Sequence, residues 1–370
     1  PKEKGHPRPA RTTTRAQRGK RFRNGARVPL LLDPSYHPMT TFPKSTRIPS
    51  GRLRYGVATS AFQIEGATSA DGRGRSVWDD FCQEPGRIDR AEHADVACDH
   101  YARMESDLDL PVCLGVDSYR FSIAWPRVIP QGTGRVEPRG LDFYERLVDG
   151  LLVRGIEPVA TLYHWDLPSP LWEHGRGWLS RTTAHAFGDY AAVVFKRLAD
   201  RVPMWMVLNE PFTIHATGSY QTGVHAPGHK GTFADRLAAG HHQLLALALT
   251  REIHSQGGWP GLVGYGEAFS PHRHGPGFDP ALAAAALEFD FFWYLEALHN
   301  GRYPLVEKDP RLAGLMPAGF EEDCRFIAQM GTGFLGVNYY TPRWIEPDAD
   351  HSLGWRPGAP PDKDVRSRNS

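Results

Sequence analysis

Segments typical of buried β-strands alternate with segments typical of helices along most of this 370-residue chain. The strand-like segments are short and apolar at their centres, and there are six of them: YGVATSAF, DSYRFSIAW, IEPVATLYHWD, MWMVLNE, GLVGYGE and GFLGVNYY. Helix-like stretches lie between them at 95–113, 140–154, 183–201, 234–257, 280–299 and 320–330. Strands that alternate with helices predict parallel βα units, and therefore an α/β protein. Within the first helix, Pro111 is expected to end the helix early.

The size of these units predicts a (β/α)8 TIM barrel with only about the first six βα units present. The six units occupy residues 55–340, about 48 residues each, and two more units of that size need roughly another hundred residues. Only 30 residues follow Tyr340. We therefore expect an incomplete, C-terminally truncated barrel over residues 39–343. Residues 344–370 are polar and rich in proline, and we expect an irregular tail without strands there.

Charge separates the beginning of the chain from the rest. Residues 1–38 hold ten of the 43 Lys and Arg residues against Glu3 and Asp33 alone. This segment lacks periodicity, and we expect a disordered basic extension, which is either a targeting segment or a stretch upstream of a natural start at Met39. Residues 39–370 hold 33 basic and 40 acidic residues. The globular part is therefore mildly acidic, and no nucleic-acid partner is expected.

Polar side chains stand at the carboxyl ends of several strand-like segments. They are Gln63, Arg120, His164, Trp165, Asn209, Glu210, Asn338 and Tyr340. Singly, such a residue is more often a structural histidine or a solvated acid. In a βα barrel, however, the carboxyl ends of the strands line the site. Amide, imidazole and carboxyl groups beside indole rings suit a polyhydroxylated ligand, which needs hydrogen-bond partners and a flat apolar wall.

The chain resembles the family 1 glycoside hydrolases of the β-glucosidase type. The matching motifs cover about residues 42–342 and follow the family's order: GVATSAFQIEGA, SVWDDF, SYRFSIAWPRV, LDFYERLVDGLL, TLYHWDLP, LNEP, GVHAPG and GVNYYT. This resemblance implies a (β/α)8 barrel and retaining hydrolysis of terminal β-glycosidic bonds in small glycosides. It implies no cofactor. The expected partner is a small-molecule β-glycoside substrate, and oligomeric state is not readable from the sequence.

The resemblance also assigns roles to the strand-end residues. Glu210 in LNEP matches the general acid/base, and Asn209 matches the residue that binds the sugar 2-hydroxyl. The positions that bind the glycone correspond to Gln63, His164 and Trp165. The supporting residues are Arg120, Asn338 and Tyr340, of which Arg120 and Tyr340 match groups that contact the nucleophilic carboxylate.

The catalytic nucleophile of the family has no counterpart in these 370 residues. Retaining hydrolysis uses two carboxyl groups roughly 5–5.5 Å apart, and the family places the nucleophile in a TENG-like motif on strand seven, which this sequence lacks. Glu346 and Asp166 are the acids that could replace it. Three hypotheses follow: a hydrolase that is impaired or inactive as written, a non-catalytic sugar-binding pseudoenzyme, or a non-functional fragment.

Other chemistries find little support in the sequence. The four cysteines, Cys82, Cys98, Cys113 and Cys324, show no metal spacing, and we expect reduced, mostly buried thiols. No histidine set has the spacing of a metal site, and there is no GxxxxGK[ST] or GxSxG motif. No run approaches the roughly 18 apolar residues of a membrane span. A cytoplasmic protein without a membrane partner is therefore expected.

Overall fold

A computed structural model describes residues 53–275, 278–349 and 353–359. The chain divides into two units, Pro1–Leu53 and Arg54–Ser370, and the second unit is described below. The expected basic extension at 1–38 lies outside the described residues.

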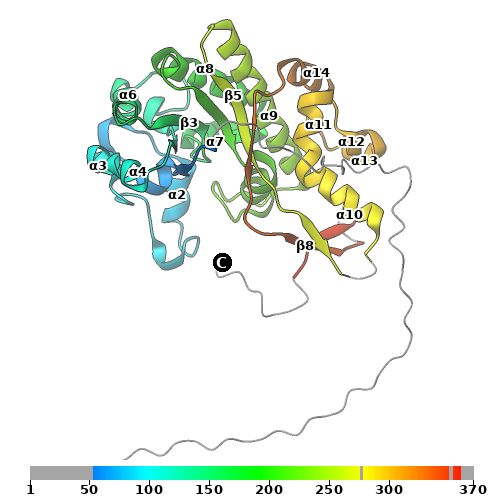
Figure 1. Ribbon diagram of the computed structural model, residues 1–370. Helices are drawn as coiled ribbons and strands as arrows, with labels where there is room; N and C mark the ends of the chain where they lie inside the picture. The colour runs from blue at the N-terminus through cyan, green and yellow to red at the C-terminus, as the bar shows by residue number, and fades with distance from the viewer. Residues whose placement is uncertain (1–52, 276–277, 350–352, 360–370) are drawn as a thin grey trace, which may run out of the picture. The chain divides into compact units, whose positions relative to one another are not determined.

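Six parallel strands form the central sheet of this unit, as predicted. They are β1 (Gly56–Ala58), β2 (Ser118–Ser122), β3 (Glu157–Tyr163), β4 (Met204–Asn209), β5 (Leu262–Ala268) and β7 (Leu335–Asn338). Their order in the sheet follows their order in the chain, and every pairing is parallel (Figure 1). Because all six run in one direction, their carboxyl ends meet at a single edge of the sheet.

Helices connect the strands and cover the sheet (Figure 1). The longer ones are α2 (Val77–Gln83), α3 (His100–Asp107), α4 (Asp109–Leu114), α6 (Pro138–Val153), α7 (Ser169–Gly175), α8 (Arg181–Leu198), α9 (Phe233–Gln256), α10 (Pro280–Leu287), α11 (Trp293–Asn300) and α14 (Phe320–Met330). Short helices are α1 (Ala61–Ile64), α5 (Trp125–Val128), α12 (Pro304–Lys308), α13 (Pro310–Ala313), and the π-helical turns η4 (Pro211–Ala216), η5 (Gly218–Thr222) and η6 (Glu288–Phe292).

Helix boundaries follow local chemistry. Helix α9 begins with a capping box in which Thr232 and Asp235 each accept the other's backbone N–H, so two otherwise unpaired donors are satisfied. The expected helix at 95–113 ends early, because α3 stops at Asp107, four residues before Pro111, whose missing N–H cannot bond to the Asp107 carbonyl. Pro111 itself lies in the first turn of the next helix, α4. The predicted helix at 280–299 is divided by η6 into α10 and α11.

A second, small sheet contradicts the prediction of an irregular tail. Strand β6 (His272–His274) pairs in parallel with β8 (Arg343–Pro347), which pairs antiparallel with β9 (Trp355–Pro357). Figure 1 shows β8 below α10. Burial explains the strands, because Ile345 and Trp355 are buried in the main hydrophobic core.

Glycines bring the central strands together beneath the site. A Cβ atom on Gly266 of β5 would lie 2.9 Å from the Met206 sulfur, and one on Gly336 of β7 would lie 2.8 Å from the Met206 methyl carbon. The side chain of Met206 on β4 therefore fills the space that a side chain at either glycine would take, over β5 and over β7 beyond it. This packing sets the distance between the ends of β4, β5 and β7, where the candidate site lies.

Candidate active site

Glu210 lies at the centre of the polar groups that close the parallel strands. It follows β4 and is only 4% exposed. Its backbone is in the left-handed region, with a φ of 48°. Its backbone N–H donates to the Gly266 carbonyl of β5 at 2.7 Å. A left-handed glutamate is uncommon and strained, and such conformations are found where a side chain must be aimed in a set direction.

Asn209, Glu210 and their neighbours form one hydrogen-bonded group. Asn338 Nδ2, at the end of β7, donates to Glu210 Oε1 at 2.7 Å and to Asn209 Oδ1 at 3.1 Å. Arg120 Nη2 on β2 donates to the same Asn209 oxygen at 2.5 Å, while its Nε donates to Thr161 Oγ1 at 2.8 Å. Strands β2 and β7 are thereby joined through Asn209 at the end of β4 and the adjacent Glu210.

Burial raises the pKa of the Glu210 carboxyl above its usual range. Three groups oppose that shift: the hydrogen bond from Asn338, the positive charge of Arg120 and a hydrogen bond from the Tyr340 hydroxyl. By the resemblance, Arg120 and Tyr340 were expected to contact a nucleophilic carboxylate. In the described residues both act on Glu210 instead.

Trp165 and His164 follow β3 and border the same group. Trp165 Nε1 donates to the Asn209 carbonyl at 2.7 Å, and its ring is stacked between those of His215 and His225, with centroids 5.7 Å and 5.2 Å away. Burial, together with the charge of Arg120, lowers the pKa of His164 to about 3, so its imidazole is neutral at physiological pH. His164 Nδ1 is buried and has no hydrogen-bond partner among the described residues, as expected of a group that awaits a polar ligand or a water molecule.

Gln63 joins His164 and Trp165 around a pocket of about 400 Å³. Its other lining residues come from the start of α1, from α2 and from the following loop: Ser60, Phe62, Trp78, Cys82, Ile88, Glu92, His93, Ala94 and Ala97. The volume falls in the range of small-molecule sites. The three predicted glycone-binding residues thus share one cavity, whereas Asn209 and Glu210 are absent from its lining.

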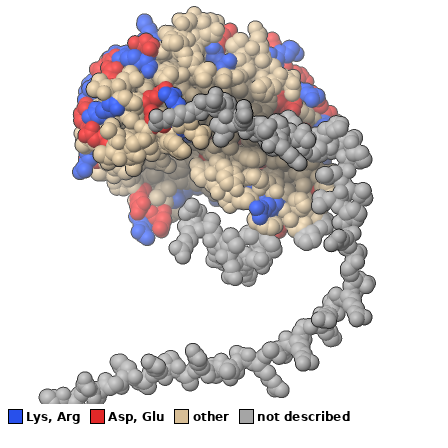
Figure 2. Space-filling view, viewed as in Figure 1, with Lys and Arg blue, Asp and Glu red and all other residues tan. Residues whose placement is uncertain are grey.

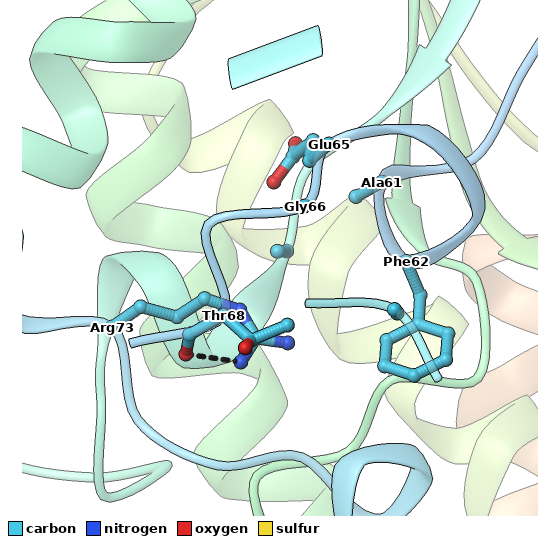
Figure 3. A pocket seen from close by; sticks show the side chains of 8 residues that line it. Ala61, Phe62, Glu65, Gly66, Thr68 and Arg73 are labelled. Atoms are coloured by element: carbon cyan, nitrogen blue, oxygen red, sulfur yellow. Dashed lines mark hydrogen bonds between the residues drawn. The ribbon is translucent and has the colours of Figure 1, made fainter. Parts of the chain in front are cut away.

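A buried ion pair fixes the helix that carries Gln63. Glu65, directly after α1, accepts from Arg127 Nε at 3.0 Å and from the Tyr144 hydroxyl at 2.6 Å. Gly66 then turns with φ of 66°, and a Cβ there would lie 2.2 Å from the Val96 carbonyl oxygen. Figure 3 shows this region: Arg73 Nη1 donates to the Thr68 carbonyl at 2.9 Å, and Glu65 lies on the other side of Gly66.

Neither acid that could replace the nucleophile has a hydrogen bond or ion pair with Glu210 or its partners in the described part of the chain. Glu346 lies on β8, where it accepts from Arg356 at 2.9 Å and from the Ala359 amide at 3.3 Å. Asp166 is buried, and burial raises its pKa to about 7. The charges that act on Asp166 are those of Arg73 and Glu65. Both acids therefore belong to other local environments than that of Glu210.

Glu267 is a carboxyl group in the site that the sequence analysis did not single out. Glu267 is the penultimate residue of β5 and is 2% exposed. The charge of Glu210 acts on it. Burial raises its pKa to about 8. The strand-end rule that identified Glu210 would have found it, since GLVGYGE also finishes on an acid.

Asp290 ties the small sheet to the same region. Its carboxylate accepts from Arg236 of α9 at 3.2 Å, from Arg343 of β8 at 2.8 Å and from His272 of β6 at 3.0 Å. Its backbone carbonyl accepts from the Thr213 hydroxyl of η4 at 2.6 Å. Hydrogen bonding from His272 and the arginine charges outweigh burial and lower the pKa of Asp290 to about 2.

We expect Asp290→Asn to lower the free energy of unfolding at pH 7 by about 2–3 kcal/mol. The folded pKa of Asp290 lies below the unfolded value, so its contribution is present above about pH 4 and is lost as the pH falls toward 2. The difference between wild type and variant should therefore shrink between pH 5 and pH 3 in urea-unfolding measurements. An equal difference at both pH values would contradict the ionised, paired state of Asp290.

Cysteine burial, metal ligands and surface charge complete the description. Of the four cysteines only Cys324 is buried, so the expectation of mostly buried thiols is wrong.

Within the described residues there is no cluster of three or more side chains suited to a metal ion. No helix in that part of the chain combines the length and apolar character that crossing a membrane requires. On the face shown in Figure 2, acidic and basic side chains are interspersed over the helices.

Comparison with known proteins gives this arrangement a family. Six parallel βα units with a polar site at their carboxyl ends define the (β/α)8 barrel class. Residues 45–362 match the Glycosyl hydrolase family 1, and the chain belongs to that family. It is 45% identical to a β-glucosidase of Agrobacterium sp. over 302 residues, which are 81% of this chain and 64% of that protein. It is 40% identical to β-glucosidase A of Acetivibrio thermocellus over 326 residues, 86% of this chain and 69% of the other.

Solved structures confirm the predicted fold class. The β-glucosidase from Thermotoga maritima in complex with deoxynojirimycin aligns with a TM-score of 0.77 at 35% identity, covering 83% of this chain and 69% of that one. A rice β-glucosidase, Os3BGlu6, aligns with a TM-score of 0.77 at 32% identity, covering 82% and 69%. The chain thus spans about two thirds of the length of these relatives.

Proposed function

We propose that this chain is a β-glucosidase-type retaining glycoside hydrolase, and that a polypeptide of these 370 residues is impaired because no strand-7 nucleophile is among them. Its substrates are the terminal β-glycosidic bonds of small glycosides. The observation that carries the proposal is Glu210, a buried carboxyl of raised pKa held by Asn338 at the carboxyl end of β4. Membership of glycosyl hydrolase family 1 supports it.

Each neighbour of Glu210 has a role in this chemistry. A carboxyl of raised pKa keeps its proton to a higher pH than an exposed carboxyl does and can give it to the departing glycosidic oxygen. Asn209, oriented by Arg120 and Asn338, binds the sugar 2-hydroxyl, a contact that strengthens in an oxocarbenium-like transition state. Gln63 and the neutral His164 bind glycone hydroxyls, and Trp165 supplies a flat wall for the sugar ring.

The second carboxyl of a retaining pair is the missing component. Glu267 is a carboxyl on which the charge of Glu210 acts, but it is buried and its oxygens accept backbone amides, so it cannot attack an anomeric carbon. The retained pocket around His164, with its unpartnered Nδ1, favours a second candidate function, that of a non-catalytic sugar-binding protein. A non-functional fragment is the remaining alternative.

An external nucleophile tests the proposal directly. The full chain is incubated with 2,4-dinitrophenyl β-glucoside, with and without sodium azide. Azide forms a bond to the anomeric carbon while the bond to the phenolic oxygen breaks, so α-glucosyl azide and dinitrophenolate are released. We expect azide to raise the release of dinitrophenolate at least about tenfold, because it supplies the group that the site lacks. The glycosyl azide is identified by NMR.

A ligand-binding measurement distinguishes between the candidate functions. The Thermotoga maritima β-glucosidase has been solved with glucoimidazole, and we propose that this chain binds the same compound. A rise in the thermal midpoint with glucoimidazole but no response to azide would favour the sugar-binding protein. No response in either measurement, from a chain that unfolds cooperatively, would contradict both functions.

A cytoplasmic location and the absence of nucleic-acid and membrane partners stay predictions from the sequence.

A further inference from the structure

Two consecutive residues of β5 hold the backbone on both sides of Glu210. The Gly266 carbonyl accepts the Glu210 N–H at 2.7 Å. The next residue, Glu267, uses its side chain: Oε2 accepts the Phe212 N–H at 3.3 Å. Pro211, between the two anchored residues, has no N–H to donate. Hydrogen bonds to β5 therefore hold the backbone at Glu210 and at Phe212, on either side of Pro211.

The amides that Glu267 receives are those that a helix leaves unpaired. Phe212 and Thr213 lie in the first turn of η4, where backbone N–H groups lack partners inside the helix. The Glu267 carboxyl accepts hydrogen bonds from both of them, and its Oε1 also accepts the N–H of Ala268 at 2.9 Å. A residue that is 2% exposed thus satisfies three buried donors directly behind the proposed acid/base.

We propose that Glu267 is a positioning residue for Glu210. Its buried carboxyl caps the π-helical turn η4 and so holds Glu210, at the end of β4, in the left-handed backbone conformation that sets the direction of its side chain. The inference rests on the proposed function, in which Glu210 is the acid/base. Glu267 touches neither the sugar nor the reacting atoms. It acts through the backbone of 210–213.

The protonation state of Glu267 suits this role. Burial and the charge of Glu210 raise its pKa to about 8, against the lowering effect of the amides that it accepts. The other ionisable groups that face it are Arg236 of α9, Tyr265 of β5 and Tyr294 of α11. At pH 7 Glu267 is therefore mostly neutral, and no second negative charge stands beside Glu210 to repel it.

The experiment compares Glu267→Gln and Glu267→Ala in the full chain. Glutamine keeps the shape and an oxygen acceptor of the neutral acid, whereas alanine leaves the amides of η4 unpaired. Hydrogen exchange of the peptide covering 205–217 is followed by mass spectrometry. We expect exchange of its protected amides at least about tenfold faster in Glu267→Ala, with most of that protection restored in Glu267→Gln. Unchanged exchange in Glu267→Ala would overturn the proposal.

Affinity and pH dependence supply readouts that helix capping alone would not move. Glucoimidazole affinity, measured by calorimetry at pH 6.5, should fall at least about tenfold in Glu267→Ala and recover to within about threefold in Glu267→Gln. The pKa of Glu267 is raised in the folded chain, so the unfolded chain loses this proton at a lower pH than the folded chain does. The free energy of unfolding of wild type therefore falls as the pH rises from about 4.5 to about 8. The Tm of Glu267→Gln should therefore gain about 5 °C on wild type between pH 5 and pH 8.

The affinity measurement and the hydrogen-exchange measurement test different claims, so one can fail without the other. A wild-type chain that neither binds glucoimidazole nor responds to azide contradicts the proposed function, while exchange at 205–217 still decides whether Glu267 holds this segment. If wild type binds and Glu267→Ala binds equally well, Glu267 does not position Glu210, whatever happens to stability. A constant Tm difference across the pH range would refute the buried neutral carboxyl.

Discussion

Replacing Glu65 by alanine is expected to lower the free energy of unfolding by about 3–5 kcal/mol. Glu65 is the acidic partner of Arg127, whose side chain is 0% exposed, and the two are joined by a 2.9 Å contact. Without Glu65 the arginine charge would stay buried and unpaired, and the Tyr144 hydroxyl would lose its acceptor. The loss is large because a buried charge that has lost its partner keeps its full desolvation penalty.

An exposed ion pair provides the matched control. Asp109 accepts from Arg154 at 2.8 Å, but the Asp109 side chain is 64% exposed, so Asp109→Ala should change stability by less than about 1 kcal/mol. Urea unfolding followed by circular dichroism measures both variants. Glu65→Gln, which retains one acceptor oxygen, should fall between them. Equal losses for Glu65→Ala and Asp109→Ala would show that the Glu65–Arg127 pair is not buried in solution.

Replacing Glu210 by glutamine is expected to lower azide-assisted cleavage of phenyl β-glucoside by about 10²–10³-fold. Phenolate is a poor leaving group, so the step needs a proton at the departing oxygen, and glutamine has no acidic proton to give. With 2,4-dinitrophenyl β-glucoside the leaving group departs unaided, and the same variant should stay within about fivefold of wild type. The measurement is the initial rate with each substrate at fixed azide concentration.

The control for this result is Glu346→Gln. Glu346 lies on β8 in a pair with Arg356, so its substitution should leave both rates unchanged. A fall in the azide-free rate of Glu346→Gln would instead identify Glu346 as a recruited nucleophile. If Glu210→Gln slows both substrates equally, Glu210 serves in binding or folding and its assignment as the acid/base fails.

The sequence predicted the strands better than it predicted what surrounds them. The six parallel strands were visible because each lies in a short segment with an apolar centre, and helix-like segments separate these segments. Strands β8 and β9 were missed because each buries essentially one large side chain, Ile345 and Trp355, among polar neighbours and prolines. A single buried residue gives no periodicity to detect.

The candidate site was predicted by residue but not by contact. Strand-end position was enough to find Asn209, Glu210 and Asn338, which the structure joins by hydrogen bonds. It could not show that Arg120 and Tyr340 act on Glu210, because that depends on which carboxyl groups the fold brings near. Glu267 was missed although it lies next to the end of β5, since its role depends on the unpaired amides of η4.

The two borders of the parallel sheet specify what a complementing polypeptide must bring. In the described part of the chain β1 pairs only with β2, and β7 pairs only with β5. Each border presents a row of backbone donors and acceptors that a further parallel strand can extend. A separately expressed fragment with two βα units and one carboxylate would then turn a chromogenic glycoside into a signal of reassembly. Under the proposed function, the partner of such a fragment is a chain in which Asn338 already holds Glu210 and Asn209.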